Sequence, residues 1–122
     1  MGPHALIDVF DADGLLVQRL RVVAWPLRIG RGLDNDIVLD DPHVAAHHAE
    51  IAPDDEGVLW ANDLGSVNRL QAGRGSRPVD RLALRTPTTL TIGHSRLRLR
   101  ASTDALPPER ASRRDLWLTR GG

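Results

Sequence analysis

The close spacing of turn-forming residues restricts the fold of this chain more than any other feature. Gly, Asn, Asp and Pro separate its apolar segments, and after Pro26 each of these segments spans only four to six residues, which is too short for an α-helix. Roughly ten short strands joined by turns are typical of a β-sandwich. The segments predicted as strands are residues 5–10, 15–25, 27–30, 36–39, 48–52, 58–63, 81–85, 89–92 and 96–100.

Two local patterns support this all-β prediction. Residues 96–100 alternate Arg and Leu, and a period of two places Leu97 and Leu99 on one buried face of a strand. The turn sequence Asp-Ala-Asp-Gly at residues 11–14 lies between the first two predicted strands. These two strands are therefore expected to form a β-hairpin.

The length of the chain predicts a single folded domain followed by a tail. A chain of 122 residues with 41% hydrophobic and 26% charged residues has the composition of an ordinary globular domain. After residue 102 the periodic apolar pattern ends, and Pro and Arg become frequent. We therefore predict a domain over residues 1–102, with residues 103–122 forming a tail or a linker to a further domain of a longer parent protein.

Composition also argues against several other classes of protein. Cysteine is absent, which excludes disulfides, thiolate metal sites and a cysteine nucleophile. The longest apolar run, residues 22–27, is far shorter than the about 20 residues of a membrane span. No signal peptide is visible, so the expected location is the cytoplasm. All sixteen basic residues are Arg, which suggests a GC-rich bacterial genome.

The zero net charge hides an asymmetry between the two halves of the chain. Residues 1–68 hold 4 Arg and 12 acidic residues, whereas residues 69–122 hold 12 Arg and 4 acidic residues. The halves, at net −8 and +8, are expected to attract each other when they pack together. Because acidic residues of the same domain neutralise the arginines, we predict no nucleic-acid partner.

Five motifs occur in an order that is more specific than any one of them. They are Gly30-Arg31, Asn35-Asp36, a turn rich in Asp followed by Val44-Ala45-Ala46-His47-His48, the run Asp63-Leu64-Gly65-Ser66-Val67-Asn68, and Ile92-Gly93. In this order and spacing the chain resembles the forkhead-associated (FHA) domain family over residues 5–101. The resemblance implies an FHA-like β-sandwich of about eleven short, mostly antiparallel strands.

The resemblance also implies a function and a binding site. FHA domains are protein-interaction modules that typically hold a phosphothreonine peptide in loops at one end of the sandwich. Arg31 matches the family's phosphate-binding arginine, and Gly30 before it is expected to allow a tight turn. Asn68 matches the asparagine that orients the peptide backbone, with a left-handed turn as its other expected role. Ser66 and Arg69 are expected at the same rim.

Three further positions match residues that support the loops. His48 matches a family histidine that ties neighbouring loops together by hydrogen bonds and does not touch the ligand. Asn35 and Asp36 are expected to brace a loop through side-chain bonds to nearby backbone. The predicted partner is therefore a protein or a phosphothreonine peptide in bacterial signalling or secretion, bound without a cofactor.

Four positions depart from the family's phosphate pocket. Ala45 stands where the family has a phosphate-donating serine, Ala46 replaces Arg or Asn, Val67 replaces threonine, and Arg69 replaces glycine. The loss of one hydrogen bond to a charged group costs about 1.5–3 kcal/mol, or roughly 10- to 150-fold in affinity. Two alternatives stay open: Arg69 and His47 replace the missing donors, or the eroded pocket binds a partner without phosphate.

An enzyme or metal protein is the competing class. His43, His47 and His48 lie near two aspartates, and His43 and His47 have the four-residue spacing of a helical metal site. Asp41-Pro42 and the strand-like flanks argue against a helix there. The sequence contains no nucleophile elbow, Walker loop or dinucleotide fingerprint, so we predict neither catalysis nor a bound metal.

Overall fold

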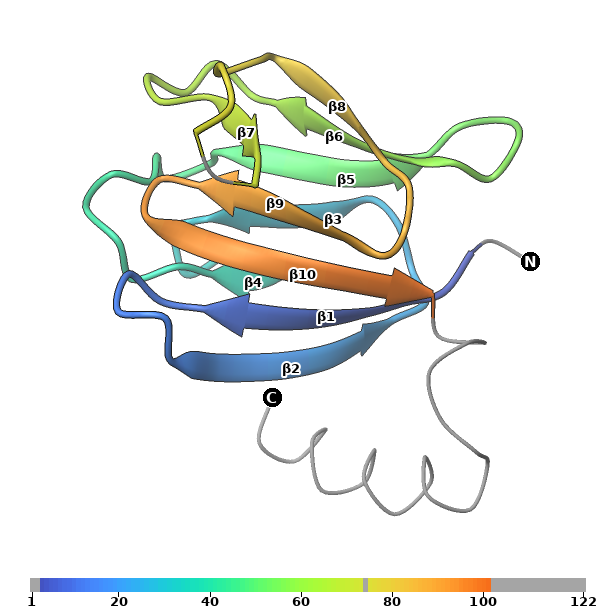
Figure 1. Cartoon of the computed structure of the whole chain (residues 1–122), viewed down its shortest axis with the longest axis horizontal. Coiled ribbons are helices and arrows are strands. Elements are labelled where there is room, and N and C mark those ends of the chain that lie inside the picture. The colour runs from blue at the N-terminus through green and yellow to red at the C-terminus, as the bar shows by residue number, and fades with distance from the viewer. Residues whose placement is uncertain (1–2, 74, 102–122) are drawn as a thin grey trace.

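The regular elements of the described part of the chain are β-strands, as the sequence predicts. The computed structural model describes residues 3–73 and 75–101, and over these residues it has ten strands and no helix, hence no helix that could cross a membrane (Figure 1). The strands are β1 (Ala5–Phe10), β2 (Leu16–Val22), β3 (Leu27–Gly30), β4 (Ile37–Val38), β5 (Ala49–Pro53), β6 (Leu59–Asp63), β7 (Leu70–Ala72), β8 (Arg81–Leu84), β9 (Thr88–Ile92) and β10 (Ser95–Ala101).

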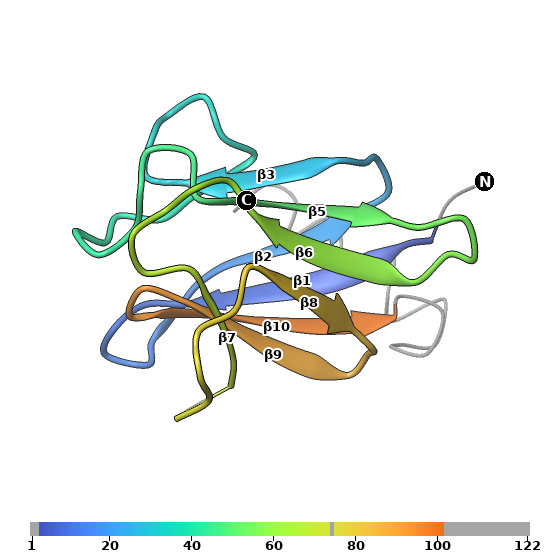
Figure 2. The ribbon, with the colours of Figure 1, turned by 90° about the horizontal axis from the view of Figure 1, so that it is seen from above.

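The strands form two five-stranded sheets that pack face to face. One sheet has the order β2-β1-β10-β9-β7, and the other has the order β4-β3-β5-β6-β8. Figure 2 shows the two layers from above. All pairings are antiparallel except that of β3 with β4, which is parallel. This arrangement confirms the predicted all-β sandwich.

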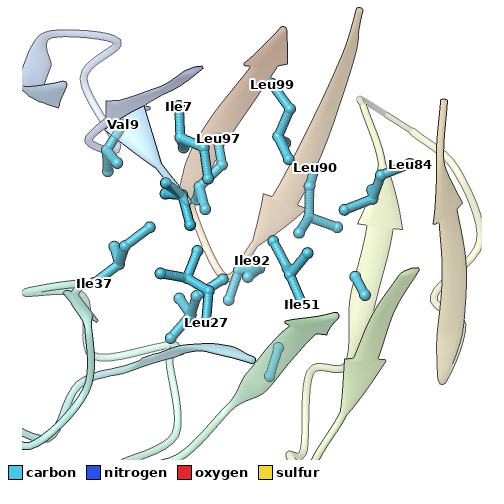
Figure 3. Close-up of a cluster of buried hydrophobic side chains, with 14 of the residues drawn as sticks. Ile7, Val9, Leu27, Ile37, Ile51, Leu84, Leu90, Ile92, Leu97 and Leu99 are labelled. Carbon is cyan, nitrogen blue, oxygen red and sulfur yellow. The ribbon is translucent and has the colours of Figure 1, made fainter. Parts of the chain in front are cut away.

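Alternating side chains from both sheets fill the space between the layers. Ile7 on β1 lies opposite Leu99 on β10, and both side chains are fully buried. Ile51 on β5 contributes to the same core from the other sheet (Figure 3). The Arg-Leu alternation of β10 therefore buries Leu97 and Leu99, as its period of two predicts.

Two details of the strand prediction differ from the structure. Strand β7 was not predicted. Only Leu70 of its three residues is buried, and a single buried residue gives no alternating pattern in the sequence. Strand β2 ends at Val22, whereas the sequence predicts a strand that continues to Trp25. Trp25 lies beyond the strand, and its indole Nε1 donates to the Pro3 carbonyl at 2.8 Å. The predicted tail over residues 103–122 lies outside the described residues.

A buried carboxylate links the oppositely charged halves of the chain. Asp8 on β1 is almost fully buried, although it faces away from the core. Its Oδ1 accepts a hydrogen bond from Arg19 Nε at 3.0 Å, and its Oδ2 lies 3.6 Å from Nη2 of Arg100. Of these two partners, only Arg100 comes from the basic second half.

The path of the strands gathers five connections at one end of the sandwich. The β1–β2, β3–β4, β4–β5, β6–β7 and β9–β10 connections all lie at the left in Figure 1. Three of them carry the sequence motifs: residues 31–36, 39–48 and 64–69. Residues far apart in the sequence therefore meet at this end.

Replacement of a core leucine tests the packing of the two sheets. Leu97→Ala leaves a cavity between the layers, because Leu97 is fully buried. We expect it to lower the free energy of unfolding by about 2–5 kcal/mol in urea denaturation. The control Leu15→Ala, at a position 63% exposed, should change stability by less than about 0.5 kcal/mol. Equal effects of the two substitutions would contradict this packing.

Candidate functional site

Arg31 is held by the neighbouring loop so that its charged end faces solvent. It follows the last residue of β3, and its backbone N–H donates to the Ala45 carbonyl at 2.9 Å. Its side-chain Nε donates to the Val44 carbonyl at 3.1 Å. Within residues 3–73 and 75–101, the two terminal nitrogens have no hydrogen-bond partner, and the side chain is exposed. The guanidinium is thus positioned by main chain and is free to bind an anion.

Gly30 allows two loops to approach each other closely. It does not form the tight turn expected from the sequence, because it is the last residue of β3. Its φ is not in the left-handed region. A Cβ at this position would lie 2.3 Å from the Ala46 carbonyl oxygen and 2.8 Å from Asn35 Nδ2. Any side chain here would therefore separate the β3–β4 loop from the β4–β5 loop.

Two side chains fix the β3–β4 loop. Asn35 is largely buried, and its Nδ2 donates to the carbonyls of Gly32 at 2.8 Å and Ala46 at 2.7 Å. Asp36 Oδ2 accepts the backbone N–H of Arg28 at 2.8 Å. Asn35 therefore joins two loops, whereas Asp36 fastens the loop to the start of β3.

His48 joins the β4–β5 loop to the β6–β7 loop from a fully buried position. Its Nδ1 accepts the backbone N–H of Ala45 at 3.1 Å, so Nδ1 carries no proton. Its Nε2 therefore carries the proton and donates to the Arg69 carbonyl at 2.8 Å. A neutral imidazole satisfies both contacts, and each ring nitrogen positions one loop.

The hydroxyl of Ser66 belongs to the same buried network. It donates to Asp63 Oδ1, accepts the backbone N–H of Arg69 at 2.9 Å and lies 3.0 Å from His48 Nε2. The other carboxylate oxygen of Asp63 accepts the N–H groups of Gly65 and Ser66. The sequence prediction placed Ser66 among the ligand-binding residues, but its hydroxyl is occupied inside the loop.

Two roles were expected of Asn68: side-chain hydrogen bonding and a left-handed turn. Asn68 has the first and Arg69 has the second. Asn68 Nδ2 donates to the His43 carbonyl at 2.8 Å and so bridges two loops. The left-handed conformation belongs to Arg69, with φ 56°, where the family pattern has glycine. Arg69 Nη1 lies 3.3 Å from Asp80 Oδ1, and both side chains are exposed. The Arg69 guanidinium therefore contacts Asp80 in this structure. It is not positioned to share an anion with Arg31 while this contact holds.

Asp41 is a supporting residue that the sequence analysis did not single out. Its Oδ1 accepts the N–H of His43, while its Oδ2 accepts the N–H of His94 and the Ser95 hydroxyl, all at 2.8–2.9 Å. Burial raises the pKa of Asp41, but these hydrogen bonds outweigh burial and hold it below the ordinary value of 3.8. The signal in the sequence was the pair Asp41-Pro42, because Asp before Pro is typical of a turn that the Asp side chain stabilises.

The histidines of the competing metal hypothesis have separate partners. His43 stacks on His94 with ring centroids 3.9 Å apart, and His48 is buried between loops. His47 Nε2 lies 2.8 Å from Asp34 Oδ2, and this hydrogen bond holds the pKa of Asp34 below its ordinary value. In the part of the chain that the structure describes, no three His, Asp or Glu side chains form a group that could hold a metal.

The site as a whole combines one presented cation with backbone donors and apolar side chains. In the described ranges, the backbone N–H groups of Ala46 and Val67 have no hydrogen-bond partner. The side chains of Leu33 and Val67 are 90% and 93% exposed. This rim can therefore bind an anion through Arg31 and main-chain N–H groups, and it can also contact apolar groups.

The Asp41 network predicts an acid-dependent loss of stability. A folded-state pKa below 3.8 means that Asp41 contributes stability above the unfolded-state pKa, and that this contribution is lost as pH falls through the folded-state pKa. We expect Asp41→Asn to lower the free energy of unfolding by about 1–3 kcal/mol at neutral pH in urea denaturation. The difference from wild type should shrink as the pH falls through the folded-state pKa of Asp41. A difference independent of pH would contradict this role.

The conformation of Arg69 predicts a stabilising substitution. Arg69→Ala and Arg69→Gly both remove the contact with Asp80, but only glycine relieves the left-handed φ of 56°. We expect Arg69→Gly to be more stable than Arg69→Ala by about 0.5–1 kcal/mol in thermal unfolding. The matched pair Asn68→Gly and Asn68→Ala should show no such gain from glycine, because Asn68 lacks a positive φ. Equal stability of the two Arg69 variants would be evidence against this conformation.

Comparison with solved structures identifies the same architecture. A structure from a study of phosphothreonine-dependent FHA domain interactions is 26% identical, with a TM-score of 0.66, and the match covers 85% of this chain and 98% of that one. The FhaA FHA domain, complexed with the intracellular domain of Rv3910, is 27% identical, with a TM-score of 0.65 and coverage of 79% and 99%. Comparison with curated protein sequences gives no significant match.

EmbR of Mycobacterium tuberculosis, solved with a low-affinity phosphopeptide, is 28% identical with a TM-score of 0.66. The match covers 84% of this chain but only 26% of EmbR. The sequence pattern of the FHA domain matches residues 27–93, which is more than half of the chain and includes all three site loops. The chain therefore belongs to the FHA domain family.

Proposed function

We propose that this FHA domain binds a phosphothreonine-containing segment of a protein partner at the three loops, with Arg31 as the principal phosphate ligand. The observation that carries this proposal is the geometry of Arg31. The Val44 carbonyl holds its Nε, and its terminal nitrogens face solvent without a partner among the described residues. A guanidinium fixed in this way loses little entropy when it binds a phosphate dianion.

Asn68 contributes to binding by orienting the peptide. Its Nδ2 donates to the His43 carbonyl, which leaves its Oδ1 to accept a backbone N–H of the ligand. Within this proposal Ser66 supports the loop, because its hydroxyl is engaged by Asp63 and Arg69. Arg69 is an auxiliary cation, since its exposed contact with Asp80 is weak enough to exchange for a phosphate.

The ligand should bind with modest affinity, because side-chain donors are missing from the pocket. Ala45, Ala46 and Val67 offer only backbone groups, and the N–H of Ala45 is already bonded to His48. Each missing charge-assisted hydrogen bond is worth about 1.5–3 kcal/mol. The proposed site therefore depends on Arg31 more strongly than a pocket with several hydroxyl donors would.

One observation favours a second candidate function, in which the partner is unphosphorylated. Leu33, Leu64 and Val67 are large apolar side chains exposed around the site, and two of them are at least 90% exposed. Exposed apolar residues that gather on one surface favour protein contact. A scaffold that binds through this rim would use the FHA fold without phosphate chemistry.

We further infer that the domain is a cytoplasmic interaction module without catalytic activity. The FHA family is a family of interaction modules and not of enzymes. The absence of cysteine from the sequence fits a reducing compartment. We also propose that the domain acts in a bacterial signalling or secretion pathway.

Calorimetric titration with paired peptides distinguishes the two functions. We expect peptides with phosphothreonine to bind, their unphosphorylated counterparts to bind at least about tenfold more weakly, and Arg31→Ala to abolish the difference. Arg28→Ala is the matched control, because Arg28 is exposed on β3 but pairs with Glu50. If phosphorylation has no effect on affinity, the phosphate-dependent function is wrong and the scaffold function is favoured.

Restoration of one hydroxyl tests the missing donors. Ala45→Ser places a hydroxyl one residue after Val44, whose carbonyl holds Arg31. We expect phosphopeptide affinity to rise roughly tenfold or more, because one charge-assisted hydrogen bond is regained. Affinity for the unphosphorylated peptide should not change. A gain that is equal for both peptides would show that the hydroxyl does not contact phosphate.

A further inference from the structure

The outer face of the β2-β1-β10-β9-β7 sheet carries a concentration of arginines that the binding loops do not use. Strand pairing places Asp8 opposite both Arg19 and Arg98, and it places Phe10 opposite Arg96. Among the described residues, these pairings align one carboxylate on β1 with five arginines on β2 and β10: Arg19, Arg21, Arg96, Arg98 and Arg100. This face is thus strongly basic although the whole chain has no net charge.

The single carboxylate of this face is already engaged. Asp8 contacts Arg19 at 3.0 Å and Arg100 at 3.6 Å. Arg96 and Arg98 form no ion pair with any carboxylate of residues 3–73 or 75–101. Arg98 instead lies over the Phe10 ring, with its guanidinium carbon 5.7 Å from the ring centroid.

These two arginines line an open pocket of about 400 Å³. The other lining residues are Phe10, Gly14, Gly73 and Thr89. The end of Arg96 reaches the β1–β2 turn, since a Cβ on Gly14 would lie 3.6 Å from its Nη2. None of the lining residues belongs to the three loops around Arg31, so the pocket is separate from the proposed phosphate site.

We propose that this pocket is a second docking site, which binds Asp or Glu side chains of an acidic segment in a protein partner. Two guanidinium groups two residues apart on β10 match carboxylates, which accept paired hydrogen bonds from arginine. The Phe10 ring and the Thr89 hydroxyl supply an apolar contact and a further donor. This inference goes beyond phosphothreonine binding, because it concerns a different face and an unphosphorylated ligand.

Charge distribution favours an acidic protein segment over a nucleic acid. A long polyanion is attracted by the field of the whole domain, and this chain is neutral overall. Asp13 directly precedes Gly14, which lines the pocket from the β1–β2 turn. A short acidic segment has to reach only Arg96 and Arg98, so its binding depends less on the field of the whole domain than the binding of a long nucleic acid does.

Fluorescence anisotropy with a labelled oligoglutamate peptide at low ionic strength tests the site. We expect the wild-type domain to bind this probe, the double variant Arg96→Gln with Arg98→Gln to bind about tenfold more weakly, and added salt to weaken binding. Asp13→Asn should strengthen binding, because it removes a negative charge beside the pocket. Circular dichroism melts would establish that each variant is folded.

Two controls separate this site from the loops. Arg28→Gln, on the other sheet, and Arg31→Ala should both keep the affinity for oligoglutamate. Loss of binding in Arg31→Ala, or no loss in the Arg96 and Arg98 double variant, would overturn the proposal. So would a wild-type domain that does not bind the probe. A single-stranded oligonucleotide of equal charge that binds more tightly through the same two arginines would replace the protein partner with a nucleic acid.

Discussion

The binding end of this domain depends on one buried imidazole. His48 accepts an N–H from the β4–β5 loop with one ring nitrogen and donates to the β6–β7 loop with the other. A neutral histidine makes both bonds without the cost of burying a charge. The N–H of Ala45 donates to His48, and the carbonyl of Ala45 accepts the backbone N–H of Arg31, so the buried histidine helps to fix the loop that positions the Arg31 guanidinium.

The loops retain the polar residues that brace them but lack the hydroxyl donors expected in the pocket. The residues that brace the loops are present and bonded: Asn35 joins two loops, and Asp41 fastens the β4–β5 loop to the β9–β10 turn. Ala45 and Val67, which stand where the family resemblance leads us to expect phosphate-donating hydroxyls, carry no side-chain donor. The loops are therefore braced by side chains that do not depend on these two positions, and Arg31 is a cation that the braced loops present to solvent.

The sequence predicted the sandwich because its strands have strong local signals. The alternation of Arg and Leu in β10 and the turn at residues 11–14 each determine a strand or a hairpin without knowledge of the rest. The short strand β7 could not be predicted, since its pairing with β9 depends on a tertiary contact. Family resemblance located Arg31 and Asn68 in the loops, where the structure also places them.

Other features of the site required three-dimensional information. The motif predicts a turn at Gly30, but in the structure Gly30 allows close approach to the carbonyl of Ala46, 16 residues later. The inward orientation of the Ser66 hydroxyl and the left-handed backbone of Arg69 are likewise invisible in a motif. The pocket at Arg96 and Arg98 arises only when strand pairing places both side chains beside Phe10.

Nuclear magnetic resonance mapping with phosphothreonine, beside unphosphorylated threonine, is the sharpest test of phosphate binding at Arg31. Arg31 is the presented cation, and the N–H groups of Ala46 and Val67 are among the unbonded backbone donors of the described site. We expect phosphothreonine to shift the Arg31 Nε–H resonance and the amide resonances of Ala46 and Val67, and threonine to shift none of them. If both ligands leave these resonances unchanged, or if the shifts fall outside the three loops, the phosphate site at Arg31 is contradicted.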